Sequence, residues 1–291
     1  MKLLTYSHQG VQEVGVIASD PQKVVPVRAL GFSAQDMNEF IRQLDSRSPT
    51  EFTAQADAAP GHPLDSCRLL SPIPQPRQDV VCLGVNYYEH RDETLASNIK
   101  YDGKLTKPIY FSKRVNRAVD PNGMIDSHSN LTGQLDYEAE LAVILSRDAK
   151  DVPTDQVKDY ILGYTILNDV SARDLQSAHQ QWYFGKSLDN FTPMGPWIVT
   201  RDELDWMPKA GIRSYVNGEL RQNSSTDLMI TSIETAVHQL TQGITLLAGT
   251  IIAMGTPSGV GMAFDPQKYM RPGDVVRCEI DGIGALENTV G

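Results

Sequence analysis

Two glutamates and an aspartate of this 291-residue chain could hold a metal ion. Glu138 and Glu140 lie two residues apart in the segment DYEAELAVIL, which predicts a strand, so both side chains point to the same face. Two buried carboxylates repel each other unless a cation lies between them. The alternative interpretation is a half-exposed strand whose acidic face is solvated.

Asp169 adds a third carboxylate to this candidate site. It follows the apolar run GYTILN, where a strand gives way to a turn and then to a helix-compatible segment. Without an accompanying cysteine or a nearby histidine, the three carboxylates form an all-oxygen set, which suits Mg²⁺, Mn²⁺ or Ca²⁺ better than zinc. The alternative role for Asp169 is to cap the N-terminus of the following helix.

A histidine and a glutamate three residues apart form a second candidate group. In the segment NYYEHRDE, His90 and Glu93 share one helical turn. A carboxylate bonded to one imidazole nitrogen orients the ring and makes the other nitrogen a better base. The alternative is an exposed histidine in a charged turn.

The elements that must position these residues are mostly strands. Strand patterns recur from Val80 to the C-terminus, whereas helical patterns are confined to the segments 154–167, 170–182 and 232–243. Many short strands, turns rich in glycine and proline, and few helices predict a β-rich α+β fold.

The chain is expected to divide into a small N-terminal domain, residues 1–70, and a larger domain, residues 71–291. The first part contains two strand patterns around a Gly-centred turn and a helical pattern over 33–47. Pro72, Pro74 and Pro76 follow at alternate positions, which forbids a helix and favours an extended connector.

The composition restricts the partners and the location of the protein. Lys plus Arg number 26 against 36 for Asp plus Glu, a formal net charge of −10, which argues against binding nucleic acid or an anionic membrane through a basic face. A small anionic substrate stays compatible, because a local cationic cluster can oppose the global sign. Three cysteines without a CxxC pair, no signal-peptide core and no apolar run of membrane-spanning length predict a cytoplasmic protein with reduced thiols.

Six segments, in this order along the chain, resemble the motifs of the fumarylacetoacetate hydrolase family: DYEAELAVIL, GYTILNDVSARDLQ, GKSLDNFTPMGPW, VNGELRQNSSTDLMI, AGTIIAMGTPSGVG and PGDVVRCEIDGIGALEN. The resemblance runs from about Val80 to the C-terminus, and the opening residues resemble the small N-terminal domain of bacterial members. It implies a catalytic domain built as a mixed β-roll and a homodimer. The motif spacing looks closest to the acylpyruvase and oxaloacetate decarboxylase members.

The resemblance also assigns roles by position. Glu138, Glu140 and Asp169 match the ligands of Mg²⁺ or Mn²⁺, and Lys186 matches the active-site lysine. His90 and Glu93 match a catalytic pair that sits on a lid segment over the metal. The positions that match substrate-binding residues are Lys113, Arg173, Gln176 and Thr256. His179 is a further candidate, because it lies near Lys186 in the sequence.

These assignments imply an enzyme that cleaves C–C bonds of a short 2-oxo acid. The ion would stabilise the pyruvate enolate released when the bond beyond carbon 3 breaks. His90 would activate water in acylpyruvate hydrolysis, whereas oxaloacetate would lose CO₂ without water. Within the family, the alternatives are isomerases or decarboxylases of aromatic-acid degradation and hydrolases of diketo-deoxy sugar acids. Outside enzymes, the alternative is a catalytically idle metal-binding protein.

Overall fold

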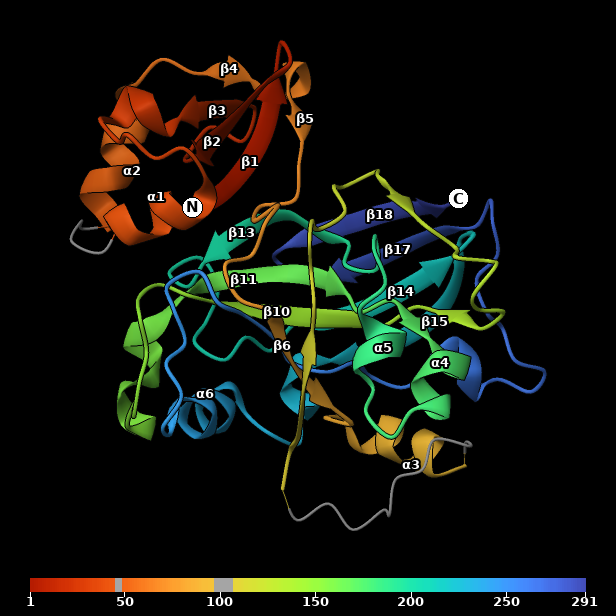
Figure 1. The fold of residues 1–291 in the computed structure, drawn as a ribbon. Coiled ribbons are helices and arrows are strands. Elements are labelled where there is room, and N and C mark those ends of the chain that lie inside the picture. Colours follow the sequence, from red (N-terminus) through yellow and green to blue (C-terminus); the bar gives the residue numbers. More distant parts are fainter. Residues whose placement is uncertain (45–48, 97–106) are drawn as a thin grey trace.

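The computed structural model describes residues 1–44, 49–96 and 107–291. Figure 1 shows a small N-terminal lobe that lies against one side of a larger lobe. The large lobe contains part of an 11-stranded sheet, a five-stranded sheet, a two-stranded sheet and few helices, so the predicted β-rich α+β fold is confirmed.

The small lobe is formed by the first part of the chain. Its elements are β1 (Lys2–His8), β2 (Val11–Ile17), β3 (Lys23–Pro26), η1 (Val27–Leu30), α1 (Met37–Leu44), α2 (Pro49–Ala58), β4 (His62–Pro63), η2 (Leu64–Ser66) and β5 (Arg68–Leu69). Gln9 and Gly10 both have positive φ and form the two-residue turn between β1 and β2, as a tight hairpin requires. Of the helix expected over 33–47, the structure contains α1, and residues 45–47 lie outside the described residues.

The large lobe follows a connector, residues 71–79, that contains no helix or strand. Its strands are β6 (Val80–Gly84), β7 (Ile109–Lys113), β8 (Met124–Ile125), β9 (Leu135–Asp136), β10 (Ala139–Leu145), β11 (Ile161–Asn168), β12 (Ser171–Ala172), β13 (Met194–Thr200), β14 (Gly211–Val216), β15 (Glu219–Ser225), β16 (Ile251–Ala253), β17 (Val275–Ile280) and β18 (Gly284–Val290). Its helical elements are α3 (Tyr88–Ala96), η3 (Thr154–Tyr160), α4 (Arg173–Ala178), α5 (Tyr183–Lys186), η4 (Thr226–Leu228), α6 (Ile233–Thr241) and η5 (Gly261–Ala263).

Strand β10 lies inside the large sheet, which has the order β4-β3-β2-β1-β13-β11-β10-β16-β6-β7. All of β10 is buried, and its side chains alternate between two hydrophobic clusters. Leu141 and Val143 pack in a cluster that includes the second sheet, β15-β14-β17-β18-β8, whereas Ala142 and Ile144 pack in a cluster that includes Leu3 and other residues of the small lobe. Both faces of the strand are therefore covered.

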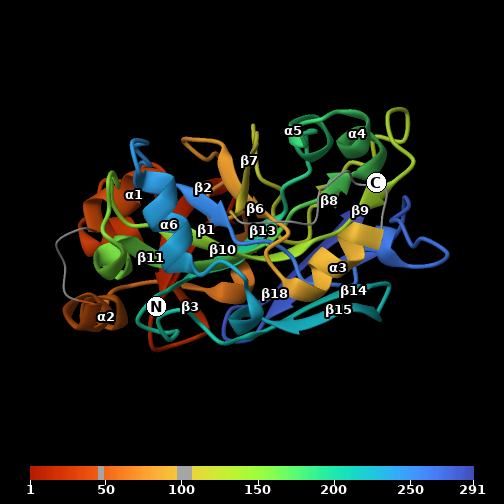
Figure 2. The ribbon, with the colours of Figure 1, turned by 90° about the horizontal axis from the view of Figure 1, so that it is seen from below.

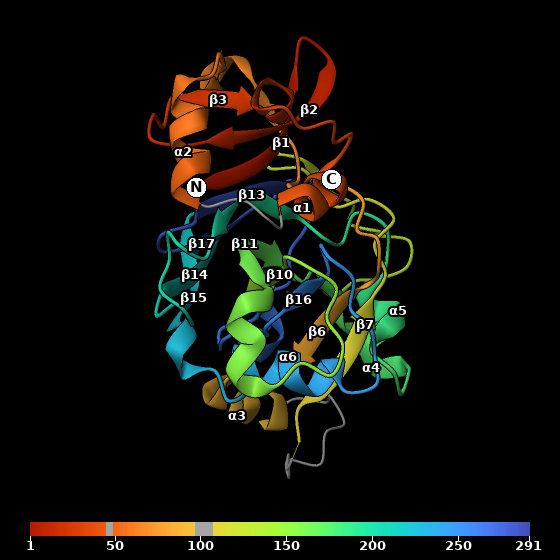
Figure 3. The same ribbon diagram turned by 90° about the vertical axis from the view of Figure 1, so that its left-hand side faces the viewer.

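The two lobes share the large sheet. Strand β1 pairs with β13 through Lys2 with Val199 and Leu3 with Ile198. Figure 3 shows β1 directly beside β13 at the junction of the lobes. The boundary predicted between residues 70 and 71 falls in the connector, but the sheet itself continues across it.

The segment 154–167 differs from the helix expected there. Thr154–Tyr160 forms the 3₁₀ element η3, and the apolar half of the segment lies in strand β11. Strand β11 pairs with β10 on one side and β13 on the other, so it is an inner strand buried on both faces. A short apolar run fits a buried strand as well as a helix, and here the tertiary pairing decides.

The other two helical patterns form shorter helices than expected, α4 and α6. Cys82 and Cys278 are buried, Cys67 is partly exposed, and all three are free thiols. Among the described residues, no helix combines the length and the apolar character needed to cross a membrane.

Candidate active site

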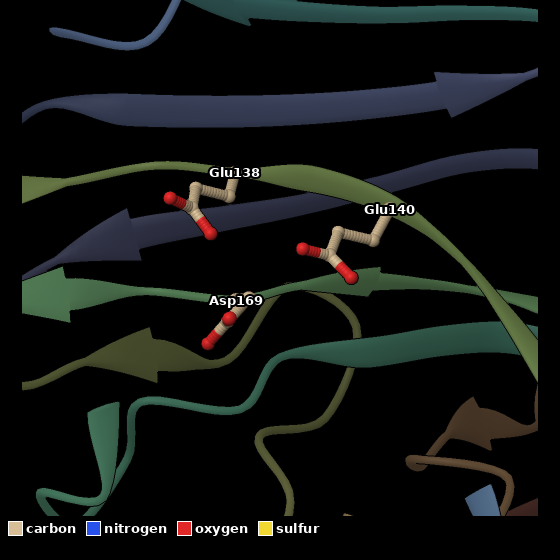
Figure 4. Close-up of side chains that lie close together, drawn as sticks. All are labelled: Glu138, Glu140 and Asp169. Carbon is tan, nitrogen blue, oxygen red and sulfur yellow. The ribbon is translucent and has the colours of Figure 1, made fainter. Parts of the chain in front are cut away.

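Three carboxylates meet where β10 begins and β11 ends. Figure 4 shows Glu138 and Glu140 extending from the same side of one strand toward the neighbouring segment that carries Asp169. One oxygen of each carboxylate lies within 4.8 Å of the others, all three residues are buried, and within the described residues this is the only such group of possible metal ligands. The predicted shared face of the two glutamates is thus confirmed.

The backbone fixes this convergence. Asp169 N donates a hydrogen bond to Glu138 O (2.9 Å), and Glu138 N donates to Asn168 Oδ1 (2.9 Å). Ala139, between the glutamates, donates to Gln222 Oε1 (3.0 Å) and accepts from Thr256 Oγ1 (3.0 Å). The peptide groups that carry both glutamates are therefore held by side chains of other elements.

Three buried cations surround two of the three carboxylates. Lys186 Nζ, at the end of α5, donates to Glu138 Oε2 (2.6 Å) and to Asp169 Oδ2 (2.7 Å). Arg173 Nη2, at the start of α4, lies 2.7 Å from Glu138 Oε1. Lys113 Nζ, at the end of β7, lies 2.7 Å from Asp169 Oδ1. Glu138 and Asp169 thus each contact two cations.

Glu140 lacks such a partner in the described part of the chain. It accepts one hydrogen bond, from Gly255 N (2.9 Å). Burial raises the pKa of Glu140, and the negative charges of Asp169 and Glu138 raise it further. Burial also opposes ionisation of Glu138, but Lys186 and Arg173 outweigh it and lower the pKa of Glu138 to about 2.

This imbalance fits an additional cation. With Asp136 included, four buried carboxyl groups face three cationic side chains, so one carboxyl group has no cationic partner among the described residues. The available donors are carboxylate oxygens, which Mg²⁺ and Mn²⁺ prefer. Glu138, Glu140 and Asp169 therefore suit the divalent ion that the sequence predicts.

Asp136 is a positioning residue that the sequence analysis missed. It accepts hydrogen bonds from Arg173 Nε (2.8 Å) and from the main-chain N atoms of Gly261 (2.7 Å) and Met262 (3.0 Å). Arg173 is thereby held between Asp136 and Glu138. Burial alone would lower the pKa of Arg173, but the charges of Glu138 and Asp136 outweigh it and raise that pKa. The only sequence signal for this role was its place two residues before Glu138.

A small cavity of about 20 Å³ lies beside this cluster. Seven of the predicted site residues line it: His90, Glu138, Glu140, Arg173, Gln176, Lys186 and Thr256. The remaining wall is largely apolar and consists of Leu83, Gly84, Val85, Phe111, Trp182 and Met262, with Thr94 beside His90. This volume holds about one water molecule, so the side chains that line the cavity must move apart to admit a substrate.

His90 and Glu93 form the predicted pair on one turn of α3. His90 Nδ1 lies 3.3 Å from Glu93 Oε2, and the His90 side chain is 8% exposed. Glu93 Oε1 accepts a hydrogen bond from Gly259 N (2.8 Å). Because Glu93 engages Nδ1, Nε2 of His90 is the nitrogen left for proton transfer. The exposed-histidine alternative is wrong for this residue.

Helix α3 is also tied to the loop after β16 by a second contact. Ser258 Oγ donates to Glu89 Oε2 (2.9 Å), one turn before Glu93. Figure 2 shows α3 beside the segment that contains this loop. The His90–Glu93 pair is therefore carried on a short helix with two attachment points.

Three predicted site residues do not line the cavity but contact residues that do: Glu93, Lys113 and Asp169. Lys113 is fully buried and donates to the carbonyl groups of Val170 (3.0 Å) and Lys186, in addition to its ion pair with Asp169. Glu93 and Asp169 contact residues that line the cavity. Lys113 thus positions Asp169 and Lys186 in this structure.

His179 lies apart from the site. It is exposed and packs edge-on against Phe184, with ring centroids 5.3 Å apart. It is not among the residues that line the cavity.

Known proteins are similar to this chain in sequence and in fold. A family model described as fumarylacetoacetate (FAA) hydrolase, C-terminal, matches residues 79–291. The oxaloacetate tautomerase YisK of Bacillus subtilis (strain 168) is 41% identical over 228 residues, which are 78% of this chain and 74% of that protein.

Solved structures extend the similarity to the whole chain. A fumarylacetoacetate hydrolase from psychrophilic Exiguobacterium antarcticum is 36% identical, with a TM-score of 0.84 over 100% of this chain and 99% of that one. The maleylpyruvate hydrolase from Sphingobium sp. SYK-6, in complex with manganese(II) ion and pyruvate, is 25% identical, with a TM-score of 0.79 over 100% of this chain and 98% of that one.

Proposed function

The chain belongs to the fumarylacetoacetate hydrolase family, and on this premise we propose that it is a metal-dependent enzyme acting at carbon 3 of short 2-oxo acids. One observation carries the proposal: a histidine–glutamate pair and a cluster of metal-type carboxylates face the same small cavity. Neither group alone would indicate this chemistry.

Glu138, Glu140 and Asp169 are the residues that would hold Mg²⁺ or Mn²⁺. When bound there, the ion supplies Lewis-acid polarisation of the keto oxygen of the substrate. The manganese and pyruvate in the structure of the maleylpyruvate hydrolase support this assignment.

Lys186 and Gln176 orient an anionic substrate. The buried Lys186 ammonium is held charged, since Asp169 and Glu138 raise its pKa against the effect of burial. It places positive charge where an oxyanion develops. Gln176 accepts a hydrogen bond from Arg173 Nη1 (3.0 Å) through Oε1, which leaves its Nε2 amide to donate toward a carboxylate in the cavity.

His90 moves the proton. Its Nε2 would take a proton from carbon 3 of a 2-oxo acid and return it to the product, while Glu93 holds Nδ1. In hydrolysis of an acylpyruvate, the same nitrogen would take a proton from the attacking water. Decarboxylation of oxaloacetate requires no base, because the bond to the leaving carboxylate supplies the electron pair.

Keto–enol tautomerisation of oxaloacetate is the reaction we place first. The identity of 41% with an oxaloacetate tautomerase supports it, and the reaction requires only the groups present in the cavity. Acylpyruvate hydrolysis is the second candidate, supported by the similarity to the maleylpyruvate hydrolase. Decarboxylation of oxaloacetate starts from the same substrate as tautomerisation. The two reactions can be distinguished because decarboxylation should not depend on His90.

The test is a comparison of three reactions in the wild type and in His90→Ala, with Mg²⁺ or Mn²⁺ present. Absorbance of the enol would follow tautomerisation, and coupled detection of pyruvate would follow acetylpyruvate hydrolysis and oxaloacetate decarboxylation. We expect His90→Ala to lower tautomerisation and hydrolysis about 10²–10⁴-fold, the usual contribution of a positioned base. Decarboxylation and metal affinity should change much less.

The control variant is His179→Ala, which removes an exposed imidazole outside the cavity and should change none of the three rates. An equal loss of all three reactions in His90→Ala would mean that His90 positions the substrate and does not act as the base. Full activity of wild-type protein after chelation, with no metal found by elemental analysis, would refute the metal dependence.

A further inference from the structure

Two aromatic side chains, Phe111 and Trp182, contact each other in the apolar wall of the cavity. Lys186 Nζ lies 5.3 Å from the centroid of the Phe111 ring. The Phe111 ring in turn meets the Trp182 ring edge-on, with centroids 5.3 Å apart and an interplanar angle of 70°. The charged cluster thus contacts Phe111, and Phe111 in turn contacts Trp182.

Gly84 provides the seat for the Trp182 side chain. A Cβ atom at Gly84 would lie 2.3 Å from Cζ3 and 2.8 Å from Cη2 of Trp182, so the indole rests directly on the main chain at the end of β6. Gly84 and Trp182 both line the cavity. The indole is thus held between the backbone of one strand and the aromatic ring of the next.

The position of Trp182 is also coupled to the charged cluster through the backbone. Trp182 is the N-cap residue of α5, the four-residue helix that ends at Lys186. Gly185, inside this helix, packs so closely on α4 that a Cβ atom there would lie 2.5 Å from Gln176 N. The main chain that carries the indole is therefore held in place by the same short helix that carries the lysine.

A 2-oxo acid held at the charged cluster through its carboxylate and keto oxygen would have only the apolar part of the lining left to contact its substituent on carbon 3. We propose that Trp182 closes the far end of this wall and limits that substituent to a short chain. The inference rests on the proposed function and narrows its substrate class: oxaloacetate and acetylpyruvate are accommodated, whereas the longer unsaturated dioic acids of aromatic degradation are excluded.

Binding of N-alkyl oxamates tests this limit without catalysis. These unreactive isosteres of 2-oxo acids keep the carboxylate and the adjacent carbonyl, and their alkyl chain takes the place of the carbon 3 substituent. Titration calorimetry with Mg²⁺ present would give the affinity of oxamate and of its methyl, ethyl, propyl, butyl and hexyl derivatives. For wild-type protein, we expect the affinity to fall about tenfold or more from the propyl derivative onward.

Two variants should move the limit in opposite directions. Trp182→Ala removes the indole, so longer chains should bind and gain about fourfold for each methylene group that becomes buried. Gly84→Ala forces the indole off its seat and into the cavity, so the limit should move to shorter chains. Phe184→Ala is the matched control, because Phe184 lies on the same helix but is exposed and outside the cavity.

The outcomes separate the inference from the function on which it rests. Wild-type protein that binds oxamate and all longer derivatives equally well, or a limit that Trp182→Ala leaves unchanged, overturns the role of Trp182. A limit that moves as far in Phe184→Ala as in Trp182→Ala also overturns the role of Trp182. Wild-type protein that binds no oxamate at all with Mg²⁺ or Mn²⁺ present overturns the proposed function itself.

Discussion

At the scale of single residues, the two glutamates of the acidic cluster have opposite surroundings. Glu138 is bound by Lys186 and Arg173, whereas Glu140 accepts one hydrogen bond from a main-chain N–H and has no ion pair in the described residues. In the metal-free protein, Glu138 is thus a member of an ion-pair network, and Glu140 is a buried carboxyl group without a cationic partner among the described residues, whose ionisation burial opposes.

Neutralising the two glutamates should therefore have opposite effects on the metal-free protein. At neutral pH, Glu140→Gln should raise the free energy of unfolding by about 1–2 kcal/mol, because it removes a carboxyl group that must either stay charged or take up a proton when it is buried. Glu138→Gln should lower it by about 1.5–3 kcal/mol, because Lys186 and Arg173 each lose one of their two carboxylate partners. Urea denaturation in the presence of EDTA measures both values.

Added Mg²⁺ or Mn²⁺ provides the control for these two variants. The wild type should gain stability with metal concentration, and both variants should lose this gain. If Glu140→Gln destabilises the metal-free protein as much as Glu138→Gln does, then Glu140 has a cationic partner in solution and the argument for a carboxyl group without one fails.

At the scale of elements, local patterns predicted what depends on local geometry. The two-residue spacing placed Glu138 and Glu140 on one face, and the three-residue spacing placed His90 beside Glu93. The sequence did not reveal that β11 is a strand throughout its apolar half, since pairing with β10 and β13 decides this. Asp136 and Gln222 act through partners more than 30 positions away, which spacing alone cannot indicate.

The attachment of α3 can be tested at the same scale. A nine-residue helix is marginal in isolation, so its order depends on tertiary contacts. Ser258→Ala removes the hydrogen bond to Glu89, and we expect hydrogen exchange of the α3 amides to speed up about fivefold, the effect of losing about 1 kcal/mol. The rate of the His90-dependent reaction should fall by a similar factor, while metal affinity stays unchanged.

Asp92→Asn is the matched control for this experiment. Asp92 lies on α3, is 69% exposed and pairs with its neighbour Arg91. Its replacement should leave both the exchange rates and the reaction rate unchanged. Equal exchange rates in Ser258→Ala and wild-type protein would show that the serine does not hold the helix.

At the scale of the whole molecule, we expect the homodimer that the family resemblance implies. Strand β15 is an outer strand of the second sheet, and apolar side chains are exposed on it and on the segments near α3, namely Tyr88, Leu220, Leu228 and Ile230. An open strand edge and exposed apolar side chains are features that association between copies would cover.

Light scattering checks this expectation. At micromolar concentration the mass should be twice the 32.1 kDa of one chain, and Leu228→Asp should shift it toward the single chain by placing a charge among the apolar side chains. A wild-type mass near 32.1 kDa would contradict the expected dimer.

The alternation of side chains along β10 has a consequence for how the family can vary. Ala142 and Ile144 are covered by a cluster that contains Leu3, Ile41 and Phe52 of the small lobe, on the strand that carries Glu140. The segment matched by the family model, residues 79–291, therefore does not contain its own complete cover. A relative that lost the equivalent of the first 70 residues would have to replace that cover, with a different domain or with a neighbouring subunit, before its carboxylates could be held in place.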